Sequence, residues 1–208
     1  MSVEQVTSPR RAQILREAAR LFAARGFHGV SVDEIGAASG ITGPGLYRHF
    51  RGKDAMLAEL LIGISERLLS GGRECLDAHD APADRLDALI ARHVDFALGE
   101  PALIVVHDRD LASLPEADQR KVRRLQRAYV EIWVGVVVDA YPGFARDAQP
   151  APATEAQARA SVHAVFGLLN STPHSAAAGH RGPRPPAPDT MAALLRTLAL
   201  GAFAAAGR

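Results

Sequence analysis

The sequence has a single cysteine, Cys75, among its 208 residues, and it has no long apolar run. A lone cysteine excludes an internal disulfide and any metal site built from several cysteines. The longest apolar run, Leu198 to Gly207, has ten residues, whereas a membrane-spanning helix needs about 20. The N-terminal MSVEQVTSPRR also lacks the apolar stretch of a secretory signal. We therefore expect a cytoplasmic protein with no membrane partner.

Strand patterns and the usual enzyme motifs are missing as well. No segment alternates apolar and polar residues for long enough to form a sheet, and apolar residues recur at helical spacing almost throughout. This pattern predicts an all-α fold. There is no phosphate-binding or dinucleotide-binding glycine loop, no His-x-x-x-His pair and no nucleophile motif. We expect no catalytic site, no metal and no cofactor.

The periodicity and the capping residues divide the chain into helices. About nine are predicted, at residues 9–25, 32–38, 43 onward, 54–73, 83–98, 101–113, 115–140, 153–171 and 188–206. Tyr141-Pro142-Gly143 ends one helix, and the proline-rich stretch 173–188 predicts a loop. We place a domain boundary after residue 53, giving an N-terminal domain of residues 1–53 and a larger domain of residues 54–208.

Basic residues gather near the N-terminus. Residues 1–53 carry a net charge of +4 although the whole chain carries +1, so the remainder sums to −3. This asymmetry is typical of a polyanion-binding head on a nearly neutral body.

The segment SVDEIGAASGITGPGLYRHF carries the signals of two short helices joined by a tight turn. Ser31 and Glu34 form a capping box, in which each side chain pairs with the amide of the other residue. The turn Ser39-Gly40-Ile41 provides a glycine for a left-handed helix exit, and Thr42 is expected to cap the next helix. This arrangement matches a helix-turn-helix unit.

The second of these helices is predicted to have an open, polar outer face. Leu46 and Phe50 are four residues apart and point inward together, which leaves Pro44, Tyr47 and Arg48 on or near the outside. A helix N-terminus offers free amides and the positive pole of the helix dipole, which both favour phosphate. Further phosphate donors around it are Ser31, Thr42, Tyr47, Arg51 and Lys53.

Residues 9–57, above all GFHGVSVDEIGAASGITGPGLYRHFRGKDAML, resemble the N-terminal DNA-binding domain of the TetR family of bacterial transcriptional regulators. The resemblance implies that the second helix of the unit enters the major groove. It assigns contacts with the DNA backbone to Ser31, Tyr47, His49 and Lys53. It assigns the stretch that faces base edges to Thr42, Gly43, Pro44, Gly45 and Arg48.

This chain departs from the family at two positions of that stretch. Gly43 and Gly45 have no side chain where many members carry a polar group that reads a base. Base readout is then expected from Thr42 and Arg48, and from Arg10 or Arg11 in a minor groove, with DNA shape contributing. The same glycines keep open the alternative of a helical module that does not bind DNA.

Two DNA-binding domains that lie about 34–36 Å apart, or a multiple of that distance, can bind the two halves of a palindromic site. A homodimer is therefore expected, and the resemblance implies a four-helix bundle formed by the last two helices of each copy. The expected interface residues are Phe166, Leu169, Met191, Leu195, Leu198 and Ala202.

The resemblance also implies a ligand pocket among the middle helices. Its candidate residues are His93, Phe96, His107, Tyr129, Trp133 and Phe166. His107 precedes Asp108, but adjacent residues on a helix diverge by about 100° and do not share a face, so an ion pair is favoured over a ligand or catalytic role. Five basic residues between Arg120 and Arg127 indicate a solvated face or an anionic ligand. Residues 107–136 are also similar to actinobacterial family members that sense acyl-coenzyme A or lipid-derived effectors.

Together these patterns predict a DNA-binding transcriptional repressor that a small-molecule effector, anionic or lipid-derived, releases from a palindromic operator. An all-α enzyme acting on an anionic metabolite is the alternative from another class.

Overall fold

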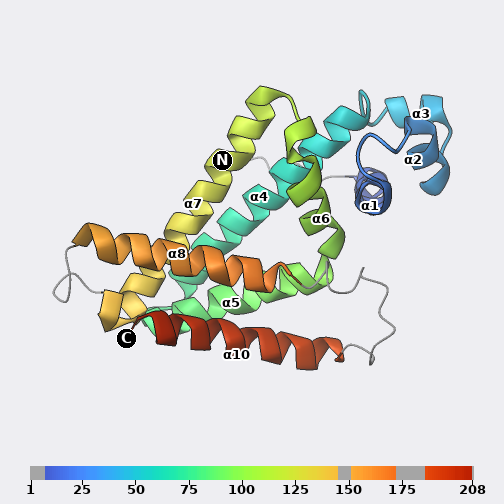
Figure 1. Cartoon of the computed structure of the whole chain (residues 1–208). Helices are drawn as coiled ribbons and strands as arrows, with labels where there is room; N and C mark the ends of the chain where they lie inside the picture. Colours follow the sequence, from blue (N-terminus) through green and yellow to red (C-terminus); the bar gives the residue numbers. More distant parts are fainter. Residues whose placement is uncertain (1–7, 145–150, 172–185, 208) are drawn as a thin grey trace. The chain divides into compact units, whose positions relative to one another are not determined.

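The structure is a computed structural model that describes residues 8–144, 151–171 and 186–207. Every regular element in these ranges is helical, as the sequence pattern predicts (Figure 1). The α-helices are α1 Pro9–Arg25, α2 Val32–Ala38, α3 Gly43–Tyr47, α4 Lys53–Ala78, α5 Pro82–Gly99, α6 Pro101–Asp110, α7 Glu116–Ala140, α8 Ala151–Leu169 and α10 Pro188–Ala206. Two short 3-10 helices are η1 Leu111–Ser113 and η2 Pro142–Phe144. Most of the loop predicted at 173–188 lies outside the described residues.

The predicted helix ends follow their capping residues. The Ser8 hydroxyl accepts from the Arg11 amide at the start of α1, and Gly26, at φ +79°, ends that helix. Gly40 has φ +66°, the left-handed conformation that the sequence predicts for the turn after α2.

α4 continues to Ala78, beyond the end predicted near residue 73. Gly71 and Gly72, which lie just before the predicted end, are both buried. A Cβ atom on Gly71 would overlap the Arg92 guanidinium, and one on Gly72 would lie 3.0 Å from the Tyr129 ring. Close packing of these two side chains on the helix backbone therefore explains why glycines occur in the middle of a continuing helix.

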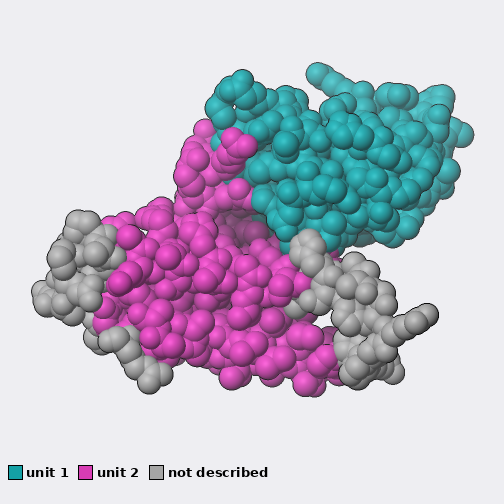
Figure 2. All heavy atoms as spheres, viewed as in Figure 1, with its two compact units in different colours: residues 1–64, 102–122 teal, residues 65–101, 123–208 magenta. Residues whose placement is uncertain are grey.

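The chain forms two compact units (Figure 2). Unit 1 comprises residues 1–64 and 102–122, and unit 2 comprises residues 65–101 and 123–208. Along the chain, α4 and α7 each begin in unit 1 and end in unit 2. The domain boundary expected after residue 53 stays a prediction.

The core of unit 1 forms around α1. Phe22 is fully buried and meets the edge of the Phe27 ring at a centroid distance of 5.3 Å. At the C-terminal end of α1, the Arg109 guanidinium donates to the Phe22 and Ala23 carbonyls and pairs with the buried Asp110 carboxylate. A cation at a helix C-terminus is favoured by the helix dipole. These contacts fix α6 against α1.

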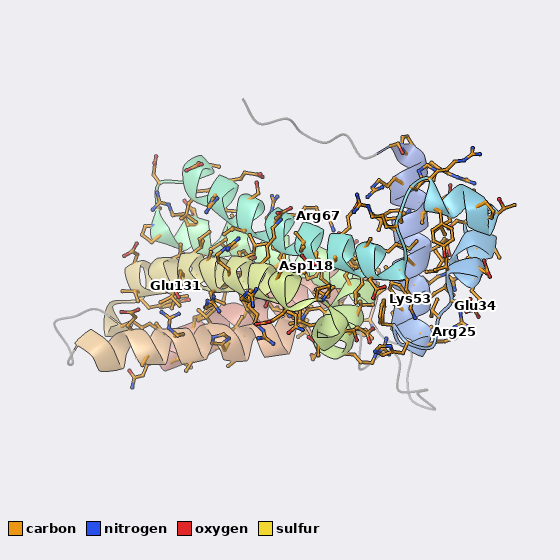
Figure 3. The ribbon with its side chains drawn as sticks, turned by 90° about the horizontal axis from the view of Figure 1, so that it is seen from above. Arg25, Glu34, Lys53, Arg67, Asp118 and Glu131 are labelled. Atoms are coloured by element: carbon orange, nitrogen blue, oxygen red, sulfur yellow. The ribbon has the colours of Figure 1, made fainter. Side chains whose placement is uncertain are left out.

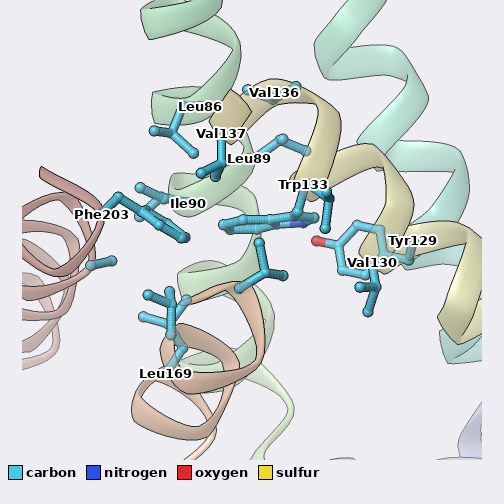
Figure 4. Close-up of a cluster of buried hydrophobic side chains, with 14 of the residues drawn as sticks. Leu86, Leu89, Ile90, Tyr129, Val130, Trp133, Val136, Val137, Leu169 and Phe203 are labelled. Carbon is cyan, nitrogen blue, oxygen red and sulfur yellow. The ribbon is translucent and has the colours of Figure 1, made fainter. Parts of the chain in front are cut away.

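The core of unit 2 is built around the fully buried Trp133 of α7 (Figure 4). α10 packs against α5 and α8, and it buries Leu195, Ala199 and Phe203 in this core. By length and composition alone α10 also passes as a membrane span, and it is the one such helix in the part of the chain that the structure describes. Only 17% of that apolar window is buried within the protomer, so packing inside unit 2 accounts for one stripe of α10 and leaves other apolar residues of this helix exposed.

Candidate nucleic-acid interface and ligand site

The capping box at the start of α2 is confirmed. The Ser31 hydroxyl accepts from the Glu34 amide at 3.2 Å, and the Glu34 carboxylate accepts from the Ser31 amide at 2.7 Å. This amide bond and the ion pair with Arg25 at 2.6 Å lower the pKa of Glu34 to about 2 (Figure 3). The Ser31 hydroxyl also donates to Glu34 at 2.9 Å. Both donors of Ser31 are therefore used inside the protein, which weighs against its expected contact with phosphate.

α3 presents the outer face that the sequence predicts. Leu46 is fully buried, whereas the side chain of Tyr47 is 58% exposed. Thr42, Pro44 and Arg48 are also exposed. One expectation is corrected: Thr42 occupies the N-cap position of α3, but its hydroxyl makes no capping bond. The helix therefore begins without a side-chain cap.

Two glycines allow α2 and α3 to approach closely. A Cβ atom on Gly36 would lie 3.0 Å from the Ile41 carbonyl oxygen, and the Ile41 amide donates to the Gly36 carbonyl at 2.9 Å. At the start of α3, a Cβ atom on Gly43 would lie 2.8 Å from an Asp33 carboxylate oxygen. The space above Gly43 is therefore shared with an acidic side chain from α2, which sequence reasoning did not identify.

Arg11 holds the base of the helix-turn-helix unit in place. Its guanidinium donates to Glu59 of α4 at 2.9 Å and to the His49 carbonyl, and it lies 4.0 Å from the centroid of the Phe50 ring. Arg10 donates to the Gly40 carbonyl at 3.0 Å. Both guanidinium groups make contacts inside unit 1, and the expectation that one of them reads a minor groove stays a prediction.

Lys53 also makes contacts inside unit 1. Its ammonium donates to the Phe27 and Val30 carbonyls at 3.0 and 3.1 Å, and it lies 4.5 Å from the centroid of the Phe27 ring. These carbonyls belong to the loop that leads into α2 (Figure 3). An ammonium has three donors, so a phosphate contact is compatible with the two bonds. Lys53 therefore orients α2 whether or not it touches DNA.

Five of the six pocket candidates gather in unit 2. The His93 ring stacks on Phe166 at a centroid distance of 4.7 Å, and it meets the edges of Phe96 and Trp133 at 5.8 and 5.9 Å. Tyr129 completes the group, with its hydroxyl 3.3 Å from His93 Nδ1. Asn170, which sequence reasoning missed, lies 3.1 Å from His93 Nε2. A polar residue directly after the apolar stripe of α8 was the available signal.

The sixth candidate, His107, belongs to unit 1. Its Nδ1 lies 3.2 Å from the Asp108 carboxylate. The pairing expected for this histidine is thus present, although the prediction that these neighbours point apart is wrong, because both side chains bend toward each other. In the basic run that follows, Arg120 pairs with Glu116, as a solvated face predicts.

Burial shifts the pKa values of His93 and Tyr129. His93 and Tyr129 are 3% and 4% exposed. Desolvation lowers the pKa of His93 to about 4, although the hydrogen bond with Asn170 opposes the change. Desolvation also raises the pKa of Tyr129 far above its usual range. Both rings are therefore uncharged at neutral pH.

Part of the expected dimer interface is buried within the protomer, and the interface as a whole stays a prediction. Leu169 and Leu195 are buried in the core of unit 2, and Phe166, Met191 and Ala202 pack against that core. Leu198 is 45% exposed, as is Leu194 one turn before it. The sequence did not separate the two sets, because on a helix that is apolar nearly all round the pattern alone does not show which stripe faces the core.

Comparison with known protein families shows to which family this chain belongs. Residues 14–60 match the family of bacterial regulatory proteins named after tetR, and residues 79–174 match the tetracyclin repressor-like C-terminal domain. The chain belongs to the TetR family. The matched segments include the helix-turn-helix unit and most of the helices around Trp133.

Characterised TetR-family relatives are transcriptional regulators. The repressor KstR2 of Mycobacterium tuberculosis H37Rv is 32% identical over 136 residues, which span 64% of this chain and 66% of the relative. The activator FasR of Mycolicibacterium smegmatis is 34% identical over 87 residues, which span 42% of this chain and 40% of FasR. The alignments with these curated relatives therefore cover just under two thirds of their length or less.

Solved structures of TetR-family proteins share the fold. A regulator from Bordetella parapertussis superposes with a TM-score of 0.76 at 23% identity, over 93% of this chain and 95% of its own. AibR, solved with isovaleryl coenzyme A and operator DNA, gives a TM-score of 0.69 at 19% identity, over 91% of this chain and 97% of its own.

Proposed function

We propose that this TetR-family protein is a cytoplasmic, non-catalytic transcriptional repressor that binds a palindromic operator as a homodimer and leaves it when a small molecule binds unit 2. The exposed tip of α3, held in place by contacts from α1, α2 and α4, is the observation that carries this proposal. At this tip the Tyr47 ring and the charged Arg48 side chain are both exposed, and exposed residues held on a rigid scaffold are typical of binding surfaces.

Within that surface, Arg48 is the side chain best suited to contact a base edge or phosphate. It is exposed and makes no side-chain hydrogen bond or ion pair with the described residues, whereas Arg10 and Arg11 make internal bonds. Tyr47, Thr42 and His49 add polar groups around it, and the glycines at positions 43 and 45 let the helix backbone approach the groove closely.

The dimer is proposed to form through the exposed stripe of α10 and the exposed face of α8. Leu194, Leu198, Gly201 and Ala205 follow one another at helical spacing on α10, and all four are exposed. An open hollow lies along α8, lined by Glu155, Ala156, Arg159, Ala160 and His163. An exposed apolar stripe is typical of an interaction surface, and a homodimer contact is the commonest use of one.

The effector is proposed to be a small organic molecule. KstR2 is named a ketosteroid regulator, and AibR was solved with an acyl-coenzyme A. A ligand that binds more tightly to a dimer conformation with one distance between the DNA-binding domains would shift the population toward that conformation. α4 is the element through which unit 2 would act, because its first residues hold the α1–α2 loop and its last residues lie in unit 2.

Salt-titrated binding to the DNA upstream of its own gene tests this proposal. A protein that neutralises phosphates loses affinity steeply as salt rises, and each lost charge contact lowers the slope of log K against log salt by about 0.9. We expect that change for Arg48→Ala. The matched control is Arg73→Ala, which removes an exposed arginine of α4 in unit 2. Equal slopes for the native protein and Arg48→Ala would contradict the proposal.

A further inference from the structure

An acidic side chain of α2 occupies the space beside the first residue of α3. A Cβ atom on Gly43 would lie 2.8 Å from Asp33 Oδ1, a distance that is too short for two such atoms. Asp33 can lie there because residue 43 has no side chain of its own. The stretch of α3 that is expected to face base edges thus lacks a side chain at Gly43, and a carboxylate from the preceding helix lies at the same place.

The helix that carries Asp33 is held in place at both ends. Ser31 and Glu34 close the capping box around its first turn. α2 also packs against α3 (Figure 1), and the Ile41 amide donates to the Gly36 carbonyl at 2.9 Å where the two helices meet. The Asp33 side chain therefore extends from a fixed backbone, which lowers the entropy cost of a contact with a partner.

The Asp33 carboxylate has no bonding role inside the protein. It is exposed, and it makes no hydrogen bond or ion pair with the residues that the structure describes. Glu34, the other acid in the first turn of α2, instead bonds the Ser31 amide and pairs with Arg25. The positive pole of a helix favours an acid in this turn, but that attraction does not require a carboxylate to lie over the start of the next helix. A donor for Asp33 therefore comes from solvent or from a partner.

A carboxylate distinguishes bases by their hydrogen-bond donors, because it has acceptors only. In the major groove the donors are the amino groups of cytosine and adenine, whereas guanine and thymine present acceptors. The adenine amino group has an acceptor on each side, its own N7 and the O4 of the paired thymine, and both repel the second carboxylate oxygen. The cytosine amino group has an acceptor on one side only, the O6 of the paired guanine. A C·G pair therefore suits the carboxylate best.

We propose that Asp33 determines base specificity, and that in each half-site its carboxylate accepts a hydrogen bond from the N4 amino group of a cytosine in the major groove. This inference rests on the proposed function and deepens it, because it names a residue and a base of operator recognition. Opposite guanine or thymine the carboxylate loses water without gaining a donor, and the DNA phosphates carry charge of the same sign. Asp33 therefore rejects wrong sequences more than it strengthens binding to the right one.

Selection of bound sequences from a randomised DNA library tests this assignment. The native protein should retain sequences with an invariant C·G pair in each half-site, and replacement of that pair by T·A in one half-site should weaken binding at least about fivefold. Asp33→Ala should retain sequences in which this one pair has become variable, and it should bind the two operators with affinities within about twofold of each other. A profile of retained sequences that is the same for Asp33→Ala and the native protein would overturn the assignment.

Two further variants separate a base contact from the effect of charge. Asparagine pairs with the N6 and N7 atoms of adenine, so Asp33→Asn should change the preference at this pair from cytosine to adenine. A variant that had merely lost structure would not acquire a new preference. The matched control is Asp54→Asn, which removes an exposed acid from the first turn of α4, also in unit 1, and which should keep the cytosine. Retention of cytosine by Asp33→Asn, or its loss in Asp54→Asn, would refute the contact.

The salt titration keeps this inference separate from the proposed function. A native protein without salt-dependent affinity for DNA would overturn the proposed function, and the assignment of Asp33 with it. A native protein that binds its operator with the expected salt slope, but whose base preference does not depend on Asp33, would leave the proposed function standing and overturn this inference alone.

Discussion

The buried histidine of unit 2 makes a quantitative prediction about acid stability. The pKa of His93 is about 4 in the folded chain, against an ordinary value of 6.5. Between these two pH values the unfolded chain binds a proton that the folded chain does not, so the free energy of unfolding falls as the pH is lowered from 6.5 toward 4. Above pH 6.5 the contribution of His93 is fully present.

The size of the loss follows from the same two values. At pH 5 the proton uptake of the unfolded state costs about 2 kcal/mol relative to pH 7.5, and the limit at low pH is about 3 kcal/mol. Few carboxylates titrate above pH 5, because their ordinary pKa values lie near 4. The lowered pKa of Glu34 places its own loss of stability below pH 4.5. Between pH 7.5 and pH 5 the loss of stability therefore comes from His93 and not from Glu34.

Urea unfolding followed by Trp133 emission measures this loss, because the indole lies in the same cluster at 5.9 Å from His93. Protein concentration is held fixed, since dimerisation would shift the midpoint. Between pH 7.5 and pH 5 the free energy of unfolding should fall by about 2 kcal/mol less in His93→Phe than in the native protein. His28→Gln, which removes an exposed histidine of unit 1, should keep the native sensitivity. Equal sensitivity in the native protein and His93→Phe would refute the reasoning.

Three further substitutions test other parts of the account. Lys53→Met removes two bonds to loop carbonyls and should destabilise unit 1 by about 1–3 kcal/mol in urea; an unaltered salt slope for DNA binding would exclude Lys53 from the phosphate contacts. Leu198→Glu changes a half-exposed side chain, so sedimentation should show monomers while the stability of the monomer changes by less than about 0.5 kcal/mol; an unchanged dimer would contradict the proposed face. Gly43→Ala displaces the Asp33 carboxylate and should alter operator affinity more than affinity for unrelated DNA; equal changes would exclude Asp33 from readout.

The sequence predicted the fold where local signals and packing agree. The capping box at Ser31, the left-handed Gly40 and the apolar spacing of α1 each depend on residues close together in the chain, and the structure contains all three. α4 is longer than predicted, and its Gly71 and Gly72 lie against side chains of other helices, Arg92 of α5 and Tyr129 of α7. Tertiary contacts of this kind are not visible in a single segment.

The candidate sites were predicted less completely, for the same reason. Arg11 looked like a free basic residue, but its partner Glu59 lies 48 residues away along the chain. Asn170 carried no motif, and its meaning depends on His93, 77 residues before it. Helical periodicity places a residue on a face but does not say which neighbour that face meets. On α10 the sequence did not separate the buried Leu195 from the exposed Leu194 and Leu198, because these leucines differ in surroundings and not in chemistry.

Site-directed DNA cleavage tests the central claim most directly. An iron chelate attached to Thr42→Cys, in a Cys75→Ala background that removes the only native cysteine, would stand at the exposed start of α3. We predict strand cleavage in two patches of the operator, separated by about one helical turn of DNA or a multiple of it. Absence of cleavage above that given by the same chelate at Arg73→Cys would contradict the account.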